Sequence, residues 1–356
     1  ELTGKWRMVA DSQDIVPVGC ERQKQHFAEV NCMAMNPLNP DVLYVGMTLE
    51  ETRGNSWASG VFKSVDGGET WFEARAMLGA GDCVDLDCRY GPSVDRLFID
   101  PDDPRVLFAS VGERGIYRTV DGGRMWEYVM QPIFCLSPQV VEKGPNGVLY
   151  TACWSYLLSS RDGGDTWQEN LSNEVWYDIQ SLAFDPRHPD RVWAGMATAS
   201  FESYLPGLIL LSEDAGESWV VRGAEIEEAC VGRPRGVYSI AICPADPDVM
   251  AASACDLFVS EDGGESWRRS EGLQDEGLWV KELTYAPLPD RCRLYASEFL
   301  EHDLWWTEDQ GQNWNLELGL SLSHLHFNPF ATNMLVGILD GRSSSFDSLF
   351  ELWVKE

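Results

Sequence analysis

The sequence predicts an all-β fold, a seven-bladed β-propeller of four-stranded antiparallel blades, on the basis of three observations. An eight-residue pattern, Ser/Thr-x-Asp-x-Gly-x-x-Trp, occurs six times, and a strand–turn–strand segment precedes each copy. The two ends of the chain look like two halves of one further unit. Successive aspartates of the pattern are 41 to 55 residues apart, a repeat length typical of propeller blades and solenoid units.

The eight-residue pattern predicts a tight turn between two strands. Its Ser or Thr and its Asp can accept hydrogen bonds from backbone N–H groups of the turn, its Gly can adopt a positive φ, and its Trp can pack at the start of the next strand. We therefore expect the motif to stabilise a hairpin rather than to bind a ligand. The six copies occupy residues 64–71, 119–126, 160–167, 212–219, 260–267 and 307–314.

The segment before each motif predicts the two inner strands of a blade. In each segment a short apolar strand ends at a turn that contains proline, and a second strand rich in small residues follows. Together with the two strands joined by the motif, this makes four strands in about 45 residues, which is one propeller blade. These segments cover residues 35–47, 99–111, 140–153, 184–196, 242–254, 286–298 and 327–339.

The chain ends predict how the last blade is completed. The seventh segment is followed by residues 349–356, and the chain stops where another motif should come. Gly4, Lys5 and Trp6 match the end of a motif with one residue dropped, and an outer strand could follow them. We therefore expect the N-terminal strand to close the last blade, so that residues 1–356 form a single domain without a free sheet edge.

The motif also carries a resemblance to a known family. It is the Asp box, or BNR motif, and the chain resembles the Asp-box β-propeller superfamily over nearly its whole length. This superfamily includes sialidases, xyloglucan-type hydrolases, sortilin-like receptors and a photosystem II assembly factor. The resemblance implies the fold and implies that the boxes lie on the face away from the active site, but it does not identify the branch.

The chain departs from both hydrolase branches of that superfamily. A sialidase would need an Arg-Ile-Pro motif near the N-terminus and three arginines around the substrate carboxylate, and the sequence shows neither. The xyloglucan-type enzymes hold their substrate between two seven-bladed domains, and this chain has residues for one. Both departures weigh against an enzyme.

The acidic composition limits the classes of partner. The formal net charge is −30, whereas nucleic acids and anionic membranes bind basic surfaces. The chain has no apolar run long enough to cross a membrane. We therefore expect a carbohydrate, a peptide or another protein as partner, with no nucleic acid and no membrane insertion.

The ten cysteines leave two interpretations open. Those in predicted strands behave as small apolar residues if they are free thiols; they are Cys32, Cys153, Cys243 and Cys255. Cys83 and Cys88 could form a local disulfide or, with nearby aspartates, hold a metal; disulfides or free thiols are favoured over metal because no zinc-type spacing occurs. We predict no metal and no cofactor. Residue 1 is Glu, which fits a removed export signal or a trimmed chain, and secretion is slightly preferred.

The candidate site comes from the innermost strands, aligned on their prolines. The second and fourth residues before the proline are apolar, as packing between blades requires, but the fifth and sixth are polar in most strands. These polar residues should lie at one height near the mouth of the central channel. The predicted catalytic residues are Asp95, Glu282 and Tyr238, and the predicted ligand-binding residues are Arg96, Lys281, His324, Asn31, Gln180 and Arg235.

Three interpretations of these polar residues remain. They could merely solvate a water-filled channel, they could bind a glycan, a peptide or a partner protein, or they could hydrolyse a glycoside. Hydrolysis would use a carboxylate pair formed by Asp95 and Glu282. Long loops at 10–28, 46–60, 76–94, 195–207 and 223–236 are expected to border the site. Binding is the preferred function, and glycoside hydrolysis is the alternative.

Overall fold

The structure is a computed structural model, and it divides the chain into two compact units. Unit 1 contains residues 1–141 and 324–356, and unit 2 contains residues 142–323. The structure describes residues 6–11, 26–51, 57–74, 94–112, 114–130, 140–153, 156–172, 177–198, 207–231, 236–272, 280–298, 303–318, 322–327, 335–340 and 350–355. The prediction that residues 1–356 form a single domain stays a prediction.

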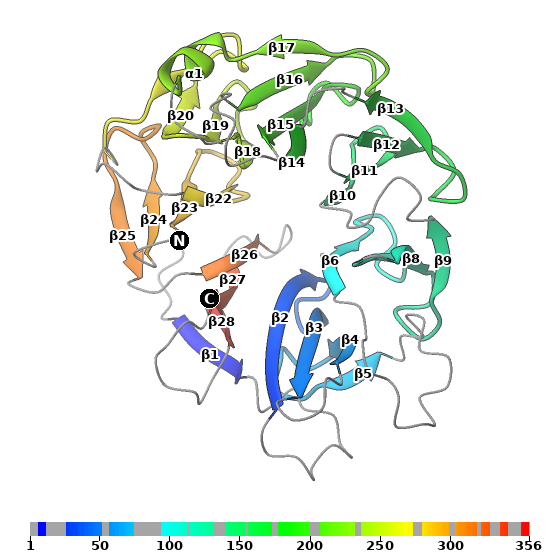
Figure 1. The fold of residues 1–356 in the computed structure, drawn as a ribbon. Coiled ribbons are helices and arrows are strands. Elements are labelled where there is room, and N and C mark those ends of the chain that lie inside the picture. The colour runs from blue at the N-terminus through cyan, green and yellow to red at the C-terminus, as the bar shows by residue number, and fades with distance from the viewer. Residues whose placement is uncertain are drawn as a thin grey trace. The chain divides into compact units, whose positions relative to one another are not determined.

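Unit 1 contains two sheets of four consecutive strands and one sheet built from both ends of the chain (Figure 1). The first two have the orders β2-β3-β4-β5 and β6-β7-β8-β9, and the third has the order β1-β28-β27-β26. Their strands are β1 (Trp6–Asp11), β2 (His26–Met35), β3 (Leu43–Glu51), β4 (Trp57–Ser64), β5 (Phe72–Ala74), β6 (Val94–Ile99), β7 (Leu107–Val111), β8 (Gly115–Thr119), β9 (Glu127–Met130), β26 (Leu322–Phe327), β27 (Leu335–Asp340) and β28 (Phe350–Lys355).

Unit 2 contains four sheets, each of four consecutive antiparallel strands, from β10 to β25. Their strands are β10 (Val140–Lys143), β11 (Leu149–Cys153), β12 (Tyr156–Ser160), β13 (Gln168–Ser172), β14 (Tyr177–Phe184), β15 (Val192–Thr198), β16 (Leu208–Ser212), β17 (Val220–Arg222), β18 (Ser239–Ile242), β19 (Met250–Ser253), β20 (Leu257–Ser260), β21 (Arg268–Arg269), β22 (Val280–Tyr285), β23 (Leu294–Glu298), β24 (Leu304–Thr307) and β25 (Asn315–Leu318). One short helix, α1 (Ala224–Ala229), connects β17 to β18.

The prediction of a seven-bladed propeller is wrong, because the strand order gives six blades. Six blades consist of four consecutive strands, and each of these six contains one copy of the eight-residue motif. The remaining sheet is a composite without a motif, in which Trp6 of β1 pairs with Lys355 of β28. The predicted pairing of the N-terminal strand with the last strand is confirmed, as are the all-β class and the four-stranded antiparallel blades. The physical reason for the difference is that an intact motif turn requires both of its strands to be consecutive in the chain.

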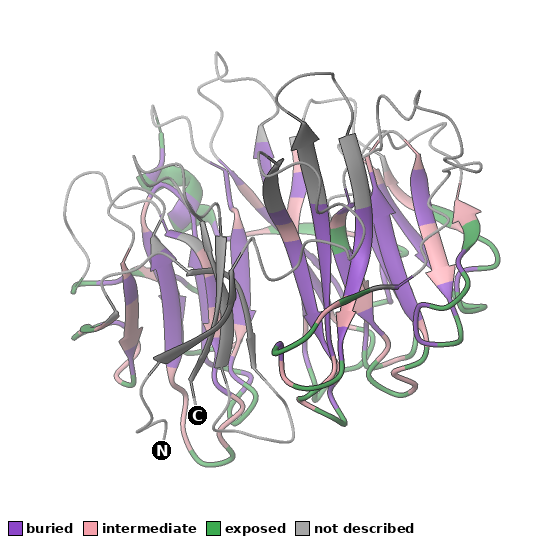
Figure 2. Cartoon of the chain, turned by 90° about the horizontal axis from the view of Figure 1, so that it is seen from below, coloured by how far each residue is buried: buried purple, intermediate pink, exposed green. Residues whose placement is uncertain are grey.

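The strand centres form the core, and the turns are exposed, as Figure 2 shows in purple and green. The second strand of a blade is the most buried: all five residues of β7 and of β11 are buried. Each blade therefore packs mainly through the apolar residues of its central strands. In unit 2, Trp193 is 1% exposed and lies in a cluster with Ile226, Phe258 and Trp267, which joins two neighbouring blades.

The motif turns contain the hydrogen-bond network that the sequence predicts. In the copy at 160–167, the Ser160 hydroxyl donates to Asp162 Oδ1 at 2.8 Å and accepts the Gly164 N–H at 2.8 Å. Asp162 also accepts the backbone N–H of Thr166 at 2.9 Å and its hydroxyl at 2.6 Å. These bonds hold the pKa of Asp162 down at about 2, from an ordinary 3.8, with the Thr166 hydroxyl as the largest cause.

Two consecutive residues of each turn adopt a positive φ, although the pattern specifies only one glycine. Gly163 and Gly164 have φ values of 75° and 95°. At the position before the invariant glycine, Ala215 and Gln310 adopt φ values of 59° and 50°, which residues with a Cβ rarely do. The turn network therefore imposes the left-handed conformation even where the residue disfavours it.

Three of the motif turns are seen to pack on the preceding blade. The Tyr44 hydroxyl donates to the Gly122 carbonyl of the next blade at 3.1 Å, and the Tyr150 hydroxyl donates to the Ala215 carbonyl at 3.2 Å. Both acceptors occupy the same position of the motif. At Gly264 an added Cβ would collide with the ring of Trp193, which comes from the equivalent second strand. The motif thus joins blades as well as strands.

Disulfides decide between the two interpretations of the strand cysteines. Cys230 is bonded to Cys255 and Cys243 to Cys292, and Cys153 is disulfide-bonded as well. Cys32 is instead a buried free thiol, and burial raises its pKa to about 12. Cys83 and Cys88 lie outside the described residues.

Replacing a buried motif serine should lower the stability of the fold. Ser160 is 2% exposed, and in Ser160→Ala the Gly164 N–H loses its partner, which costs about 1–3 kcal/mol of unfolding free energy. Urea denaturation of the variant and the native protein measures this difference. Gln168→Ala, an exposed change on the adjoining strand, is the control and should leave the unfolding free energy within about 0.5 kcal/mol. Equal stability of Ser160→Ala and the native protein would contradict the role assigned to the motif.

Candidate functional site

A β-bulge recurs in the first strand of several blades, at the level where the sequence changes from apolar to polar. The pairing shifts between Val30 and Cys32 on β2, and equivalent shifts occur on β6, β14 and β22. The extra residue in each shift is the sixth before the proline. These residues are Asn31, Asp95, Gln180 and Lys281. The polar residues predicted from sequence, which we call the polar level, therefore occur at β-bulges in the first strands. Bulges are frequent beside functional sites because they redirect side chains.

Within a blade, the bulge lies at the end opposite the motif turn. On β14, Ser181 follows the bulge and pairs with Gly195, which pairs with Ile209 near the start of β16. The motif begins at Ser212, which pairs with Val192 at the far end of the sheet. Gly195 and Val192 are three positions apart in sequence, which is about 10 Å along the strand. The motif turn and the polar level thus occupy different ends of one blade.

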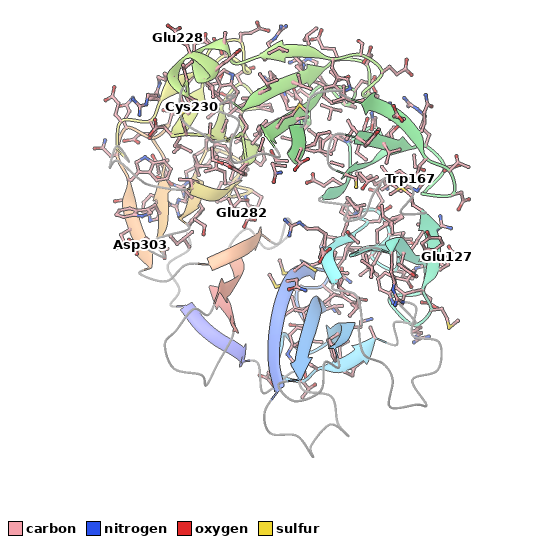
Figure 3. All side chains as sticks on the ribbon, viewed as in Figure 1. Glu127, Trp167, Glu228, Cys230, Glu282 and Asp303 are labelled. Atoms are coloured by element: carbon pink, nitrogen blue, oxygen red, sulfur yellow. A yellow bond between two sulfur atoms is a disulfide. The ribbon has the colours of Figure 1, made fainter. Side chains whose placement is uncertain are left out.

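Unit 2 places three of the predicted site residues on neighbouring first strands. Gln180 lies on β14, Tyr238 immediately precedes β18, and Glu282 lies on β22, where Figure 3 labels it. β18 lies beside both β14 and β22. Tyr238 donates its N–H to the Ser253 carbonyl at 3.0 Å, and Ser253 also pairs with Ser239. Two residues thus face one partner there, as in the bulges. All three side chains are half-buried.

The remaining predicted site residues are described less completely. In unit 1, Asn31 and Asp95 are half-buried and Arg96 is exposed, with its guanidinium donating to the Asp95 carbonyl at 3.2 Å. Lys281 lies on β22 and His324 on β26, but their side chains are outside the described part of the structure, as is all of Arg235. Asp95 and Glu282 belong to different units, so their use as a carboxylate pair stays a prediction.

Two residues at this level, Ser239 and Cys32, join neighbouring blades. The Ser239 hydroxyl accepts the Leu283 N–H of the next blade at 3.1 Å, and the Cys32 thiol donates to the Val94 carbonyl at 3.4 Å. Ser181 has its hydroxyl buried near Gly195. These contacts fix the first strands of adjacent blades against one another, next to the bulged residues.

Sequence reasoning missed one titratable residue at this level, Asp178. It lies on β14 two residues before Gln180, on the side opposite the fully buried Ile179. Burial raises the pKa of its carboxyl above the usual 3.8. A carboxyl with a raised pKa can donate a proton near neutral pH more readily than an ordinary one. The sequence does contain a signal for Asp178, because the polar residues Asp178 and Gln180 alternate with the apolar Ile179.

Two long loops meet beside Tyr238. An added Cβ on Gly236 would collide with Ala197, and one on Gly207 would collide with the backbone of Gly236 and Val237. The Val237 N–H donates to the Met196 carbonyl at 2.9 Å. The ends of the predicted loops 195–207 and 223–236 are therefore packed backbone against backbone next to the polar level.

The described residues form neither a metal site nor a membrane-spanning helix. In the ranges that the structure describes, no group of three or more His, Cys, Asp or Glu side chains is arranged to hold a metal ion. Among the same residues, no helix has the length and apolar character needed to cross a membrane.

Comparison with curated proteins finds xyloglucanases. Xyloglucanase Xgh74A of Acetivibrio thermocellus is 21% identical over 333 residues, which cover 89% of this chain and 33% of the relative. A xyloglucanase of a Paenibacillus species is 30% identical over 280 residues, covering 67% of this chain and 26% of the relative. The chain therefore spans about a third or less of the length of these relatives. No protein-family model matches the chain.

Comparison with solved structures shows the fold. YCF48 from Cyanidioschyzon merolae has a TM-score of 0.62 at 15% identity, with 99% of this chain and 98% of that one covered. YCF48 bound to D1 peptide has a TM-score of 0.61 at 14% identity, covering 93% and 96%. An ancestral GH74 enzyme has a TM-score of 0.58 at 20% identity, covering 70% and 35%. The homologues of this chain are thus GH74 xyloglucanases, and its fold is a β-propeller.

The environments of two aspartates predict opposite titration shifts. Carboxyl ¹³C NMR should give Asp178 a midpoint above 3.8, because its site is desolvated, and Asp162 one near 2, because its charged form is hydrogen-bonded. Loss of one resonance in Asp178→Asn and of the other in Asp162→Asn assigns the two signals. A midpoint at or below 3.8 for Asp178 would show that the polar level near β14 is fully hydrated.

Proposed function

We propose that this chain is a glycan-binding β-propeller that holds a xyloglucan-type polysaccharide along the bulged first strands. The observation that carries the proposal is the alignment of 89% of the chain with xyloglucanase Xgh74A, together with the polar residues at the bulges. We also infer that the chain belongs to the Asp-box superfamily, supported by six motif copies whose hydrogen bonds stabilise turns.

The chemistry of the polar level suits a neutral polysaccharide. Sugar hydroxyls both donate and accept hydrogen bonds, and Gln180, Tyr238 and Glu282 offer an amide, a phenol and a carboxylate on adjacent strands. A net charge of −30 disfavours acidic glycans and nucleic acids but leaves a neutral β-glucan unaffected. Asn31, Asp95 and Arg96 of unit 1, together with Lys281, His324 and Arg235, are proposed as further contacts.

A second candidate function, glycoside hydrolysis, is favoured by the environment of Asp178. Glycoside hydrolysis uses one carboxyl as proton donor and a second as base or nucleophile. The raised pKa of Asp178 suits the donor, and Glu282, two blades away in the same unit, offers a second carboxylate. The pair Asp95 and Glu282, with Tyr238 as a proton donor or ligand contact, is the other combination that we propose for catalysis.

Isothermal titration with xyloglucan oligosaccharides tests the binding function. The native protein should bind xyloglucan, and Tyr238→Phe and Gln180→Ala should each weaken binding about 5- to 30-fold, which corresponds to one lost hydrogen bond of roughly 1–2 kcal/mol. Gln168→Ala, on the strand that follows a motif turn, is the matched control and should bind like the native protein. Absence of binding to xyloglucan and to unbranched β-glucan would refute the proposal.

Release of reducing ends from xyloglucan separates binding from catalysis. If the protein is a hydrolase, Asp178→Asn and Glu282→Gln should lose turnover and keep their affinity within a few-fold, because the amides remain hydrogen-bonding groups. Binding without release of reducing ends by the native protein would leave the binding function and remove the catalytic one.

A further inference from the structure

Cys230, which precedes Tyr238 by eight positions in sequence, forms a disulfide with Cys255. Helix α1 follows β17 and packs Ile226, which is 1% exposed, into the cluster shared by the blades of β14–β17 and β18–β21. Cys230 caps the C-terminal end of α1 and is bonded to Cys255, between β19 and β20 (Figure 3 labels Cys230). Both cysteines are buried, at 1% and 3% exposure. The end of α1 is thereby linked to one particular hairpin.

Tyr238 is fixed to the same hairpin, and the two residues before it are fixed to the preceding blade. Tyr238 donates its N–H to the carbonyl of Ser253, two residues before Cys255. Val237 bonds to Met196 of the preceding blade, and Gly236 packs directly against Ala197. Cys230 and Tyr238 are thus attached to the same β19–β20 hairpin, Cys230 through the disulfide and Tyr238 through a backbone hydrogen bond.

We propose that the Cys230–Cys255 disulfide positions Tyr238 and the two residues before it for ligand binding, an inference that rests on the proposed glycan-binding function. Residues that are already held in their bound conformation lose less conformational entropy when a ligand binds. Cys230 and Cys255 act through Tyr238 and do not themselves contact the ligand. The disulfide is a positioning element of the site.

The second described disulfide provides a matched comparison within the same blade. Cys243 follows β18 and is bonded to Cys292, which precedes β23, so this bond joins the proline-side turns of two blades. These turns lie at the motif end of the sheets, away from the bulges, because β18 and β22 run from the bulge toward them. Removing this bond should affect the stability of unit 2 without changing the position of Tyr238.

Two double variants, Cys230→Ala/Cys255→Ala and Cys243→Ala/Cys292→Ala, test the inference by isothermal titration with a xyloglucan oligosaccharide. The first variant should bind about 3- to 10-fold more weakly, with a less favourable binding entropy. The second variant should bind like the native protein, even if its Tm falls by as much as that of the first. In a Tyr238→Ala background the first pair of substitutions should cost little further affinity, because the group that it positions is gone. Additive losses would overturn the inference.

Hydrogen exchange on the native protein tests the same point without a variant that has to fold. Amides of residues 236–238 should already exchange slowly in the free protein and change little when the oligosaccharide binds. Fast exchange in the free protein that slows on binding would overturn the inference, as would equal affinity of both double variants and the native protein. Failure of the native protein to bind any β-glucan would instead refute the proposed function, and the inference with it.

Discussion

The hydrogen-bonded motif turn is the interaction on which the rest of the structure depends. Within the turn, the Ser or Thr hydroxyl and the Asp carboxylate together satisfy backbone N–H groups that would otherwise be unpaired. Beyond the turn, its carbonyl accepts the tyrosine hydroxyl of the preceding blade, as at Gly122 and Ala215. One local motif therefore determines both the hairpin and its packing against a neighbour, and its repetition builds a core from many short strands.

Stability and proposed function use opposite ends of each blade. The motif turns and the Cys243–Cys292 disulfide hold the proline-side end, whereas the bulged strands present polar side chains at the other end. Apolar packing of the central strands lies between the two ends. Residues at the bulged end can therefore change without loss of the turn network.

Local sequence predicted the parts of the fold that local interactions determine. The motif turns, the four-stranded blades and the pairing of the N-terminal strand with β28 were predictable, because turn chemistry and periodicity are visible within a few residues. The predicted number of seven blades was wrong, since only six sheets consist of four consecutive strands joined by a motif turn. Cross-strand register and long-range contacts determine the bulges, the partners of Cys230 and Cys243 and the desolvation of Asp178. A single sequence does not contain this information.

The polar level of the candidate site was visible in the sequence. The sequence did not show that Ser239 and Cys32 join neighbouring blades at this level.

The most direct test of the motif's role is the pH dependence of the stability difference between the native protein and Asp162→Asn. The folded-state pKa of Asp162 is about 2 and its ordinary value is 3.8, so its charge contributes stability that is fully present above about pH 4 and is lost as the pH falls through the folded pKa. In urea denaturation from pH 6 to pH 2.5, the native protein should be more stable than Asp162→Asn at pH 6, and the difference should shrink steadily below pH 4. A difference that is absent at pH 6, or that stays constant down to pH 2.5, would contradict the assignment of the motif carboxylate as the group that holds the turn.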